Sequence, residues 1–192
     1  MPKVLARHQR EHPGACPSFI MGNRDPIGSA DPRGNGDVGI MGTPPEDTNI
    51  QSEVIGTHRL IFVAHPNHPL CQLDRELTPK ELIKHQLIAR EVGSGTRLAM
   101  AAYFGALFHQ ATRPPIVLDT NEGIKQSILA GMGISLLSDA TCELELNHGL
   151  LKTLPVEGTP LDRQWYAVRL ANLERNPAEQ SLLRFLVMQA ER

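Results

Sequence analysis

The sequence predicts an α/β protein in which a parallel or mixed sheet is covered by helices on both faces. The strongest observation is residues 118–138 (LDTNEGIKQSILAGMGISLLS), which indicate a strand end, a helix and a second strand. Asn121 is suited to cap this helix, and Ile124 and Ile128 give it one apolar face. Two glycines then end the helix and a short apolar strand follows. Such a crossover is typical of parallel α/β packing.

A second observation adds a candidate site to this fold. Residues 85–97 (HQLIAREVGSGTR) predict an apolar strand followed by a Gly/Ser/Thr turn that opens another helix. Backbone N–H groups at a helix start are unpaired and favour a carboxylate, phosphate or sulfate. Ser94 and Thr96 add hydroxyl groups at this position. The alternative, that one of these hydroxyls only caps the helix, stays open at this point.

The remaining elements follow in order along the chain. Thr78 and Pro79 occupy the cap and first turn of one helix. The pattern predicts helices over 4–11, 78–84, around 140–146 and over 177–189, and strands near 38–41, over 59–64, up to residue 90, over 116–118, within 149–158 and over 165–170.

Composition and charge limit the class of protein. The chain has 192 residues, 41% of them hydrophobic and 21% charged, with a net charge of −2, as in an ordinary globular protein of one domain or two small lobes. No basic excess or stripe indicates a nucleic-acid-binding face. No apolar run approaches the roughly 18 residues of a membrane span, and no secretory signal is evident. We therefore expect a cytoplasmic protein without membrane contact.

Several segments together resemble a known family. IAREVGSGTR, TNEGIKQSILAGMGISLLS and RQWYAV resemble, in this order, the effector-binding domain of LysR-type transcriptional regulators. VLARHQREHPG, GDVGIMGTPPED and LIFVAHPNHPL fit the same family, so the likeness covers nearly the whole chain. The resemblance implies a two-lobed, type 2 periplasmic-binding-protein-like fold with two crossing strands. Lobe I would comprise residues 1–62 and 164–192, and lobe II residues 63–163.

The same resemblance implies a function. A small anionic metabolite bearing phosphate, carboxylate or sulfate would bind between the lobes, and its preference for one lobe angle would be the regulatory signal. The domain would form a homodimer or homotetramer. DNA would be contacted only through an N-terminal winged helix-turn-helix, which we expect to be absent from this chain. Within the family, the chain looks most like regulators of carbon-fixation operons.

The resemblance also assigns effector contacts residue by residue. Those expected from lobe II are Ser94, Gly95, Thr96, Arg97, Gly133, Ile134 and Ser135, and Asn23 is expected from lobe I. The sequence departs from the family in lobe I: its first strand should precede Met1, and residues 23–37 should form an amphipathic helix that their prolines and glycines oppose.

Cysteine and histidine spacing offers no further chemistry. Cys16, Cys71 and Cys142 show neither disulfide nor zinc spacing, so we expect packing residues, with a peroxide switch of the kind found in one branch of the family as the alternative. His65 and His68 flank prolines in what reads as a polar turn, so neither a metal ion nor a cofactor is expected.

Motifs for catalysis are also missing from the sequence. There is no GxSxG, GxxxxGK[ST] or GxGxxG segment, so an enzyme is not expected. Two alternatives to a regulator remain: a type 2 solute-binding protein for transport, and an anion-dependent enzyme using Glu91 or Asp119.

Overall fold

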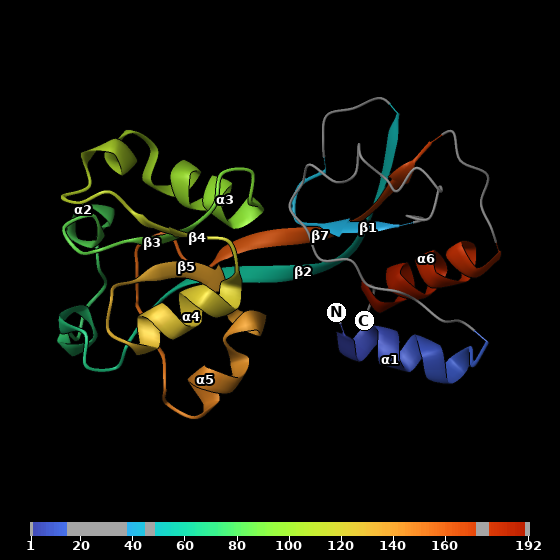
Figure 1. Cartoon of the computed structure of the whole chain (residues 1–192), viewed down its shortest axis with the longest axis horizontal. Coiled ribbons are helices and arrows are strands. Elements are labelled where there is room, and N and C mark those ends of the chain that lie inside the picture. The colour runs from blue at the N-terminus through green and yellow to red at the C-terminus, as the bar shows by residue number, and fades with distance from the viewer. Residues whose placement is uncertain (1, 15–37, 45–48, 172–176, 191–192) are drawn as a thin grey trace. The chain divides into compact units, whose positions relative to one another are not determined.

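The computed structural model describes residues 2–14, 38–44, 49–171 and 177–190 (Figure 1). The chain forms two compact units, residues 1–57 with 164–192 and residues 58–163. The divisions between the two units fall at 57/58, within the first long strand, and at 163/164. Within the described residues, no helix is both long and apolar enough to cross a membrane.

The 58–163 unit contains most of the regular structure. Strand β2 (Ile50–Ala64) enters it from the other unit, and strand β7 (Leu161–Leu170) leaves it. Between them lie the 3-10 helices η2 (Pro69–Gln72), η3 (Gly105–Gln110) and η4 (Asp139–Thr141), the helices α2 (Pro79–Leu82), α3 (Gly95–Phe104), α4 (Asn121–Leu129) and α5 (Glu143–Asn147), and the strands β3 (Ile88–Arg90), β4 (Ile116–Leu118), β5 (Ser135–Ser138) and β6 (Lys152–Thr153).

Strand pairing in this unit is mixed, as the sequence predicts. β2 pairs antiparallel with β5 and with β6, whereas β3 and β4 pair in parallel. A parallel bridge between Leu87 and Ile134 joins the start of β3 to the start of β5. The crossover from β4 through α4 to β5 therefore places three strand starts side by side.

Both faces of β2 are buried in the 58–163 unit. Phe62 packs in a core cluster with Met100 and Phe104 of α3, whereas Val63 belongs to a second cluster with Ile124 and Ile128 of α4. Consecutive strand residues point to opposite faces, so the two helices cover the two sides of the strand. This arrangement explains the nearly continuous apolar run in this part of the sequence.

The other unit is built from the two ends of the chain. Its described elements are the helices α1 (Pro2–Glu11) and α6 (Pro177–Ala190), strand β1 (Gly39–Met41), the first half of β2 and the second half of β7. β1 pairs antiparallel with β7, and Ile40 lies opposite Ala167. Ile55, Leu183 and Leu186 form its buried core together with Ala167.

Three local expectations need correction. β2 begins at Ile50 rather than at residue 59, because the residues of its first half are mostly exposed and show no apolar pattern. β7 likewise begins at Leu161 rather than at residue 165. The N-cap of α4 is Thr120, whose hydroxyl accepts a 3.0 Å hydrogen bond from the Gly123 N–H, so Asn121 is the first helical residue instead. The expected helix in residues 23–37 lies outside the described residues.

The end of α4 confirms the expected glycine stop. Gly131 has a φ of 76°, a conformation that residues other than glycine rarely adopt. Its N–H donates to the Ile128 carbonyl at 2.8 Å, and the Met132 N–H donates to the Ser127 carbonyl at 3.0 Å. These are the two hydrogen bonds of a Schellman motif. The motif turns the chain back toward the sheet, where β5 begins.

Candidate functional site

The turn after β3 is the first part of the candidate site. The Ser94 N–H donates to the Glu91 carbonyl at 3.3 Å, and the Leu98 N–H donates to the Ser94 carbonyl at 3.0 Å, which begins α3. Ser94 is thus the N-cap residue, with an extended backbone (φ −68°, ψ 135°). The chain passes directly from the end of the parallel strand into the helix, so the turn is fixed on both sides.

The hydroxyl group at this helix start does not cap the helix. Ser94 is only 6% exposed, yet its side chain makes no capping hydrogen bond. The N–H groups of Gly95, Thr96 and Arg97 belong to the unpaired first turn of the helix. Gly95 has no atom within 4 Å of the position of a Cβ, so open space adjoins these groups. A single structural role as a cap therefore does not account for Ser94.

A charged network lies immediately beside this turn. Arg90 donates to both carboxylate oxygens of Glu91, at 2.7 and 3.0 Å, and its Nη1 donates to the Asn121 side chain at 2.7 Å. The Arg90 charge is thereby neutralised. Arg97 places its guanidinium 5.0 Å from the ring centre of Phe108 and donates weakly to the Arg90 carbonyl at 3.4 Å. Arg97 thus brings a positive charge to the helix start.

The expected contacts at 133–135 are tied to β3 by hydrogen bonds. The Ile134 N–H donates to the Gln86 carbonyl at 3.0 Å, and its carbonyl accepts from the Ile88 N–H at 2.8 Å. The Ser135 hydroxyl donates to the Ile88 carbonyl at 2.7 Å, and both residues are fully buried. A Cβ on Gly133 would lie 2.2 Å from the Gln86 oxygen, so only glycine permits this approach.

The structure therefore brings most of the expected site residues to one strand. Ser94, Gly95, Thr96 and Arg97 follow the end of β3, whereas Gly133, Ile134 and Ser135 lie beside its start, so the two groups are at opposite ends of the strand. Asn23 lies outside the described residues. Sequence reasoning missed the Arg90, Glu91 and Asn121 network, because Asn121 was interpreted as a helix cap. The adjacent opposite charges of Arg90 and Glu91, at the end of a predicted strand, are the sequence feature that could have predicted this network.

The other polar candidates have structural roles. The Nδ1 atoms of His65 and His68 each accept a hydrogen bond from a backbone N–H two residues later, at 3.1 and 3.2 Å, as the expected polar turn requires. Cys71 and Cys142 are buried, and burial raises the pKa of both thiols, to about 12 for Cys142. These two cysteines are therefore packing residues, as expected. Cys16 lies outside the described residues.

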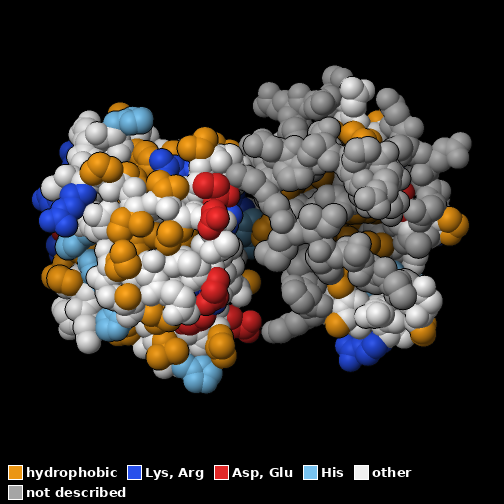
Figure 2. All heavy atoms as spheres, in the orientation of Figure 1, with side chains coloured by type: hydrophobic (Ala, Val, Ile, Leu, Met, Phe, Trp, Pro, Cys, Tyr) orange, Lys and Arg blue, Asp and Glu red, His pale blue; other side chains and the backbone are white. Residues whose placement is uncertain are grey.

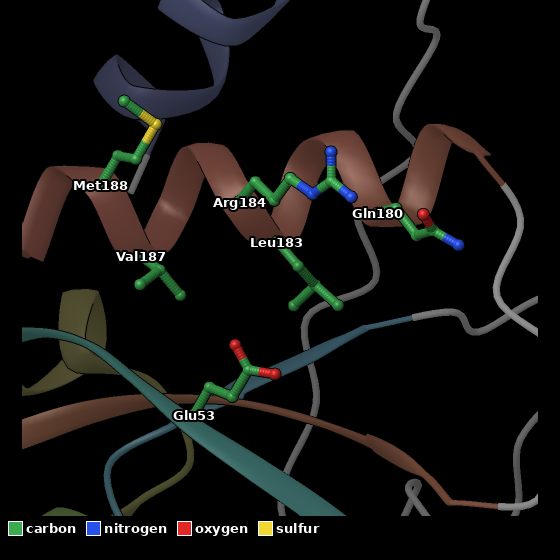
Figure 3. Close-up of a pocket in the computed structure, with 6 residues that line it drawn as sticks. All are labelled: Glu53, Gln180, Leu183, Arg184, Val187 and Met188. Atoms are coloured by element: carbon green, nitrogen blue, oxygen red, sulfur yellow. The ribbon is translucent and has the colours of Figure 1, made fainter.

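A cavity in the other unit has a different character. It measures about 280 Å³ and lies between β2 and α6, lined by Glu53, Gln180, Leu183, Arg184, Val187 and Met188 (Figure 3). Figure 3 shows Glu53 pointing from the strand toward the helix, where Leu183 and Val187 point back toward it. The cavity lies along the side of α6 and not at a helix start, so it lacks the unpaired N–H groups of the α3 turn.

Comparison with known proteins identifies relatives over almost the whole chain. A family model described as LysR substrate binding domain matches residues 1–191. The transcriptional regulator CbbR of Xanthobacter flavus is 40% identical over 96% of this chain and 56% of its own length. The RuBisCO operon transcriptional regulator of Acidithiobacillus ferrooxidans is 35% identical over 97% of this chain and 60% of its own length.

Solved structures give the same result. The regulatory domain of CcmR from Synechocystis, in complex with 2-PG, superimposes with a TM-score of 0.83 at 30% identity, covering 99% of this chain and 90% of that one. The effector-binding domain of QuiR in complex with shikimate has a TM-score of 0.76 at 18% identity, covering 99% of this chain and 90% of that one. The latter similarity supports the fold only.

Proposed function

The chain belongs to the LysR substrate-binding domain family, and we propose that it senses a small anionic metabolite at the start of α3. Its α/β fold matches that of LysR regulatory domains, and the family consists of regulator domains rather than enzymes. The chain spans 56% to 60% of the length of the two curated relatives described above, so the activity of a complete regulator is part of the proposal.

One observation carries the choice of an anion. Ser94 is only 6% exposed and its side chain makes no capping hydrogen bond, at a helix start whose first amides have no partner within the helix. The partial positive charge of a helix N-terminus and the Arg97 guanidinium both favour a negative group. Thr96 supplies a second, half-buried hydroxyl. Phosphate and carboxylate oxygens accept hydrogen bonds from all these donors, whereas a cation would be repelled.

The remaining expected contacts complete the proposed site. Gly133, Ile134 and Ser135 would support the site through their hydrogen bonds to residues at the start of β3, and Asn23 would contribute from the other lobe. The metabolite would then touch both lobes and stabilise one arrangement of them through its differential affinity. This population shift is the proposed regulatory signal.

The relatives favour a particular chemical class. The relative from Acidithiobacillus ferrooxidans is named as a regulator of the RuBisCO operon, and the CcmR regulatory domain was solved with 2-PG. A phosphate-bearing metabolite fits the donors of the α3 turn. We therefore propose that this chain serves a regulator of a carbon-fixation operon that responds to a phosphorylated metabolite.

The wider setting is proposed from the family. A complete regulator would bind DNA through a separate domain, work in the cytoplasm, and assemble as a homodimer or homotetramer through domains such as this one. On the face drawn in Figure 2, the Lys and Arg side chains of the 58–163 unit form no continuous stripe. The face drawn thus lacks the basic stripe that is typical of a DNA-binding surface.

Calorimetric titration with 2-PG and with a panel of other phosphorylated metabolites tests this proposal. We expect at least one of them to bind, and Ser94→Ala and Thr96→Val each to weaken it by about tenfold, since each removes a hydrogen bond to a charged group. Ser127→Ala is the matched control, because it removes a hydroxyl that bonds only within α4. Unchanged affinity in both site variants would place the metabolite elsewhere.

A further inference from the structure

Two histidines lie one helical turn apart at the end of α1, far in sequence from the proposed effector site. His8 is 2% exposed, whereas His12 is exposed, and the His12 N–H donates to the His8 carbonyl at 2.8 Å. Residues at this spacing lie on the same side of a helix. Their ring centres are 4.6 Å apart, so the two imidazoles are neighbours.

Each ring directs its Nε2 atom toward the Ser181 hydroxyl. The Ser181 hydroxyl of α6 lies 3.4 Å from His8 Nε2 and 3.3 Å from His12 Nε2. A hydroxyl has a single proton, so it donates to only one of the two rings. The arrangement thus leaves two imidazole nitrogens converging beside the Ser181 oxygen. His8 lies on α1, His12 directly follows it, and Ser181 lies on α6.

We propose that His8 and His12 bind a divalent transition-metal ion through their Nε2 atoms, with the Ser181 oxygen beside it. Imidazole is a common ligand for Cu²⁺, Ni²⁺ and Zn²⁺, and two histidines at this helical spacing form a known chelating pattern. Metal ligation needs a neutral ring. The Nε2 atoms of His8 and His12 already converge on one hydroxyl, so the geometry needed for two-histidine ligation is present.

The electrostatic surroundings favour a cation. The C-terminal end of α1 carries partial negative charge at this position. Glu11 adds a carboxylate, which is partly offset by Arg7 at 3.4 Å. The Arg7 guanidinium itself lies over the Phe185 ring, 5.5 Å from its centre. The Phe185 ring and the Glu11 carboxylate thus both attract the Arg7 guanidinium, which keeps its positive charge directed at these two partners.

The number and kind of the proposed ligands determine how tightly the metal ion should bind. Within the described residues, no three side chains of His, Cys, Asp or Glu gather around one point, so water would complete the coordination. The buried His8 Nδ1 has no hydrogen-bond partner among the described residues, although metal-binding histidines usually donate from that second nitrogen. We therefore expect weaker binding than in a structural zinc site, and strongest binding for Cu²⁺.

Titration of the 192-residue chain with Cu²⁺ alone, and separately with Zn²⁺, tests the proposal. We expect one ion per chain. At a free ion concentration about tenfold above its Kd, Tm should rise by about 3 to 6 °C. Electron paramagnetic resonance of the Cu²⁺ form should show coupling to two nitrogens. His12→Asn should weaken binding at least about tenfold, because loss of an outer partner alone already has an effect of that size.

His148→Asn is the matched control. His148 is also exposed near a helix end, and its Nδ1 bonds the Leu144 carbonyl. This variant should bind the ion as the parent does. Since His8 is buried and its replacement threatens folding, the decisive variant is His12→Asn. One-site binding that survives His12→Asn, coupling to a single nitrogen, or no saturable binding to the parent would each overturn the proposal.

Discussion

Strand β2 passes through both units, and it is continuously buried in one of them and mostly exposed in the other. In the 58–163 unit, residues 60–64 are buried on both faces, whereas residues 51–54 in the other unit are exposed. The backbone is extended throughout, because neighbouring strands supply its hydrogen bonds in either setting. Hydrogen bonding to neighbouring strands therefore fixes the extended backbone of β2 in both units. Burial determines how much each half contributes to stability, and whether the half shows an apolar pattern in the sequence.

Truncation of one side chain in each half of β2 is the strongest test of this contrast. Phe62→Ala should lower the free energy of unfolding by about 4 kcal/mol, because Phe62 is fully buried and contacts the rings of Tyr103 and Phe104. Val54→Ala should cost about 0.5 kcal/mol, since Val54 is 39% exposed. Urea denaturation followed by circular dichroism measures both, and equal losses would contradict the contrast.

Fluorescence separates the two units in the same experiment. Trp165 is the single tryptophan of the chain and packs against the core of the 1–57/164–192 unit. If the units unfold separately, Phe62→Ala should shift the transition seen by circular dichroism more than the one seen by Trp165 emission. Equal shifts of the two transitions would show instead that the two units unfold together, so that the loss of stability from one core lowers the stability of both.

A second test concerns the close approach that places β5 against β3. Gly133→Ala should cost about 3 kcal/mol, because the new Cβ would lie 2.2 Å from the backbone oxygen of Gln86, which has little freedom to move. Gly95→Ala is the control, since nothing lies within 4 Å of its Cβ position and alanine favours a helix. The urea midpoints of the two variants give the comparison. A loss below about 1 kcal/mol for Gly133→Ala would mean that this junction relaxes freely.

The same contrast explains what the sequence predicts well. The 58–163 unit has buried apolar strands, capped helices and glycine stops, so the crossover through α4 and the strands β3 to β5 are predictable. The starts of β2 and β7 are not, because their exposed residues are fixed by pairing with distant strands. Local pattern has no information on such pairing.

The candidate site divides in a similar manner. A Gly/Ser/Thr turn between strand and helix indicates an anion site from local sequence alone. The hydrogen bonds of Ser135 and Ile134 to β3 depend on residues about 47 positions away, so only the fold reveals them. The i, i+4 spacing of His8 and His12 can be read from the sequence. Their shared contact with Ser181, which is about 170 positions away, is revealed only by the fold.

A third test compares two adjacent residues at the start of α4. Thr120→Ala should cost about 1 kcal/mol, because it removes the oxygen that accepts from the Gly123 N–H. Asn121→Ala should cost about half as much, since the side chain of Asn121 serves only the partly exposed Arg90. Chemical denaturation of both variants measures the difference. The reverse order would restore Asn121 as the cap, as its sequence suggests.

The smallest expected effect is a pH dependence to which two neighbouring histidines of the 58–163 unit contribute. Burial lowers the pKa of His68 and of His85 below the ordinary value of 6.5, and their rings lie 4.9 Å apart. The folded state thus binds protons less readily than the unfolded chain, so this stability is complete above pH 6.5 and is lost as pH falls through the lower folded-state values. Tm should therefore fall between pH 7.5 and 5.5.

The variant His85→Gln isolates the contribution of the pair. It removes one titrating ring and relieves His68 of its positive neighbour, which is the second cause of the lowered pKa of His68 after burial. The decrease in Tm on acidification should therefore be smaller in this variant than in the parent. His58 keeps its own lowered pKa in the same unit, so some decrease should remain. An unchanged decrease would assign the whole pH dependence to histidines outside the pair, and the half-exposed rings would then titrate as they do in an unfolded chain.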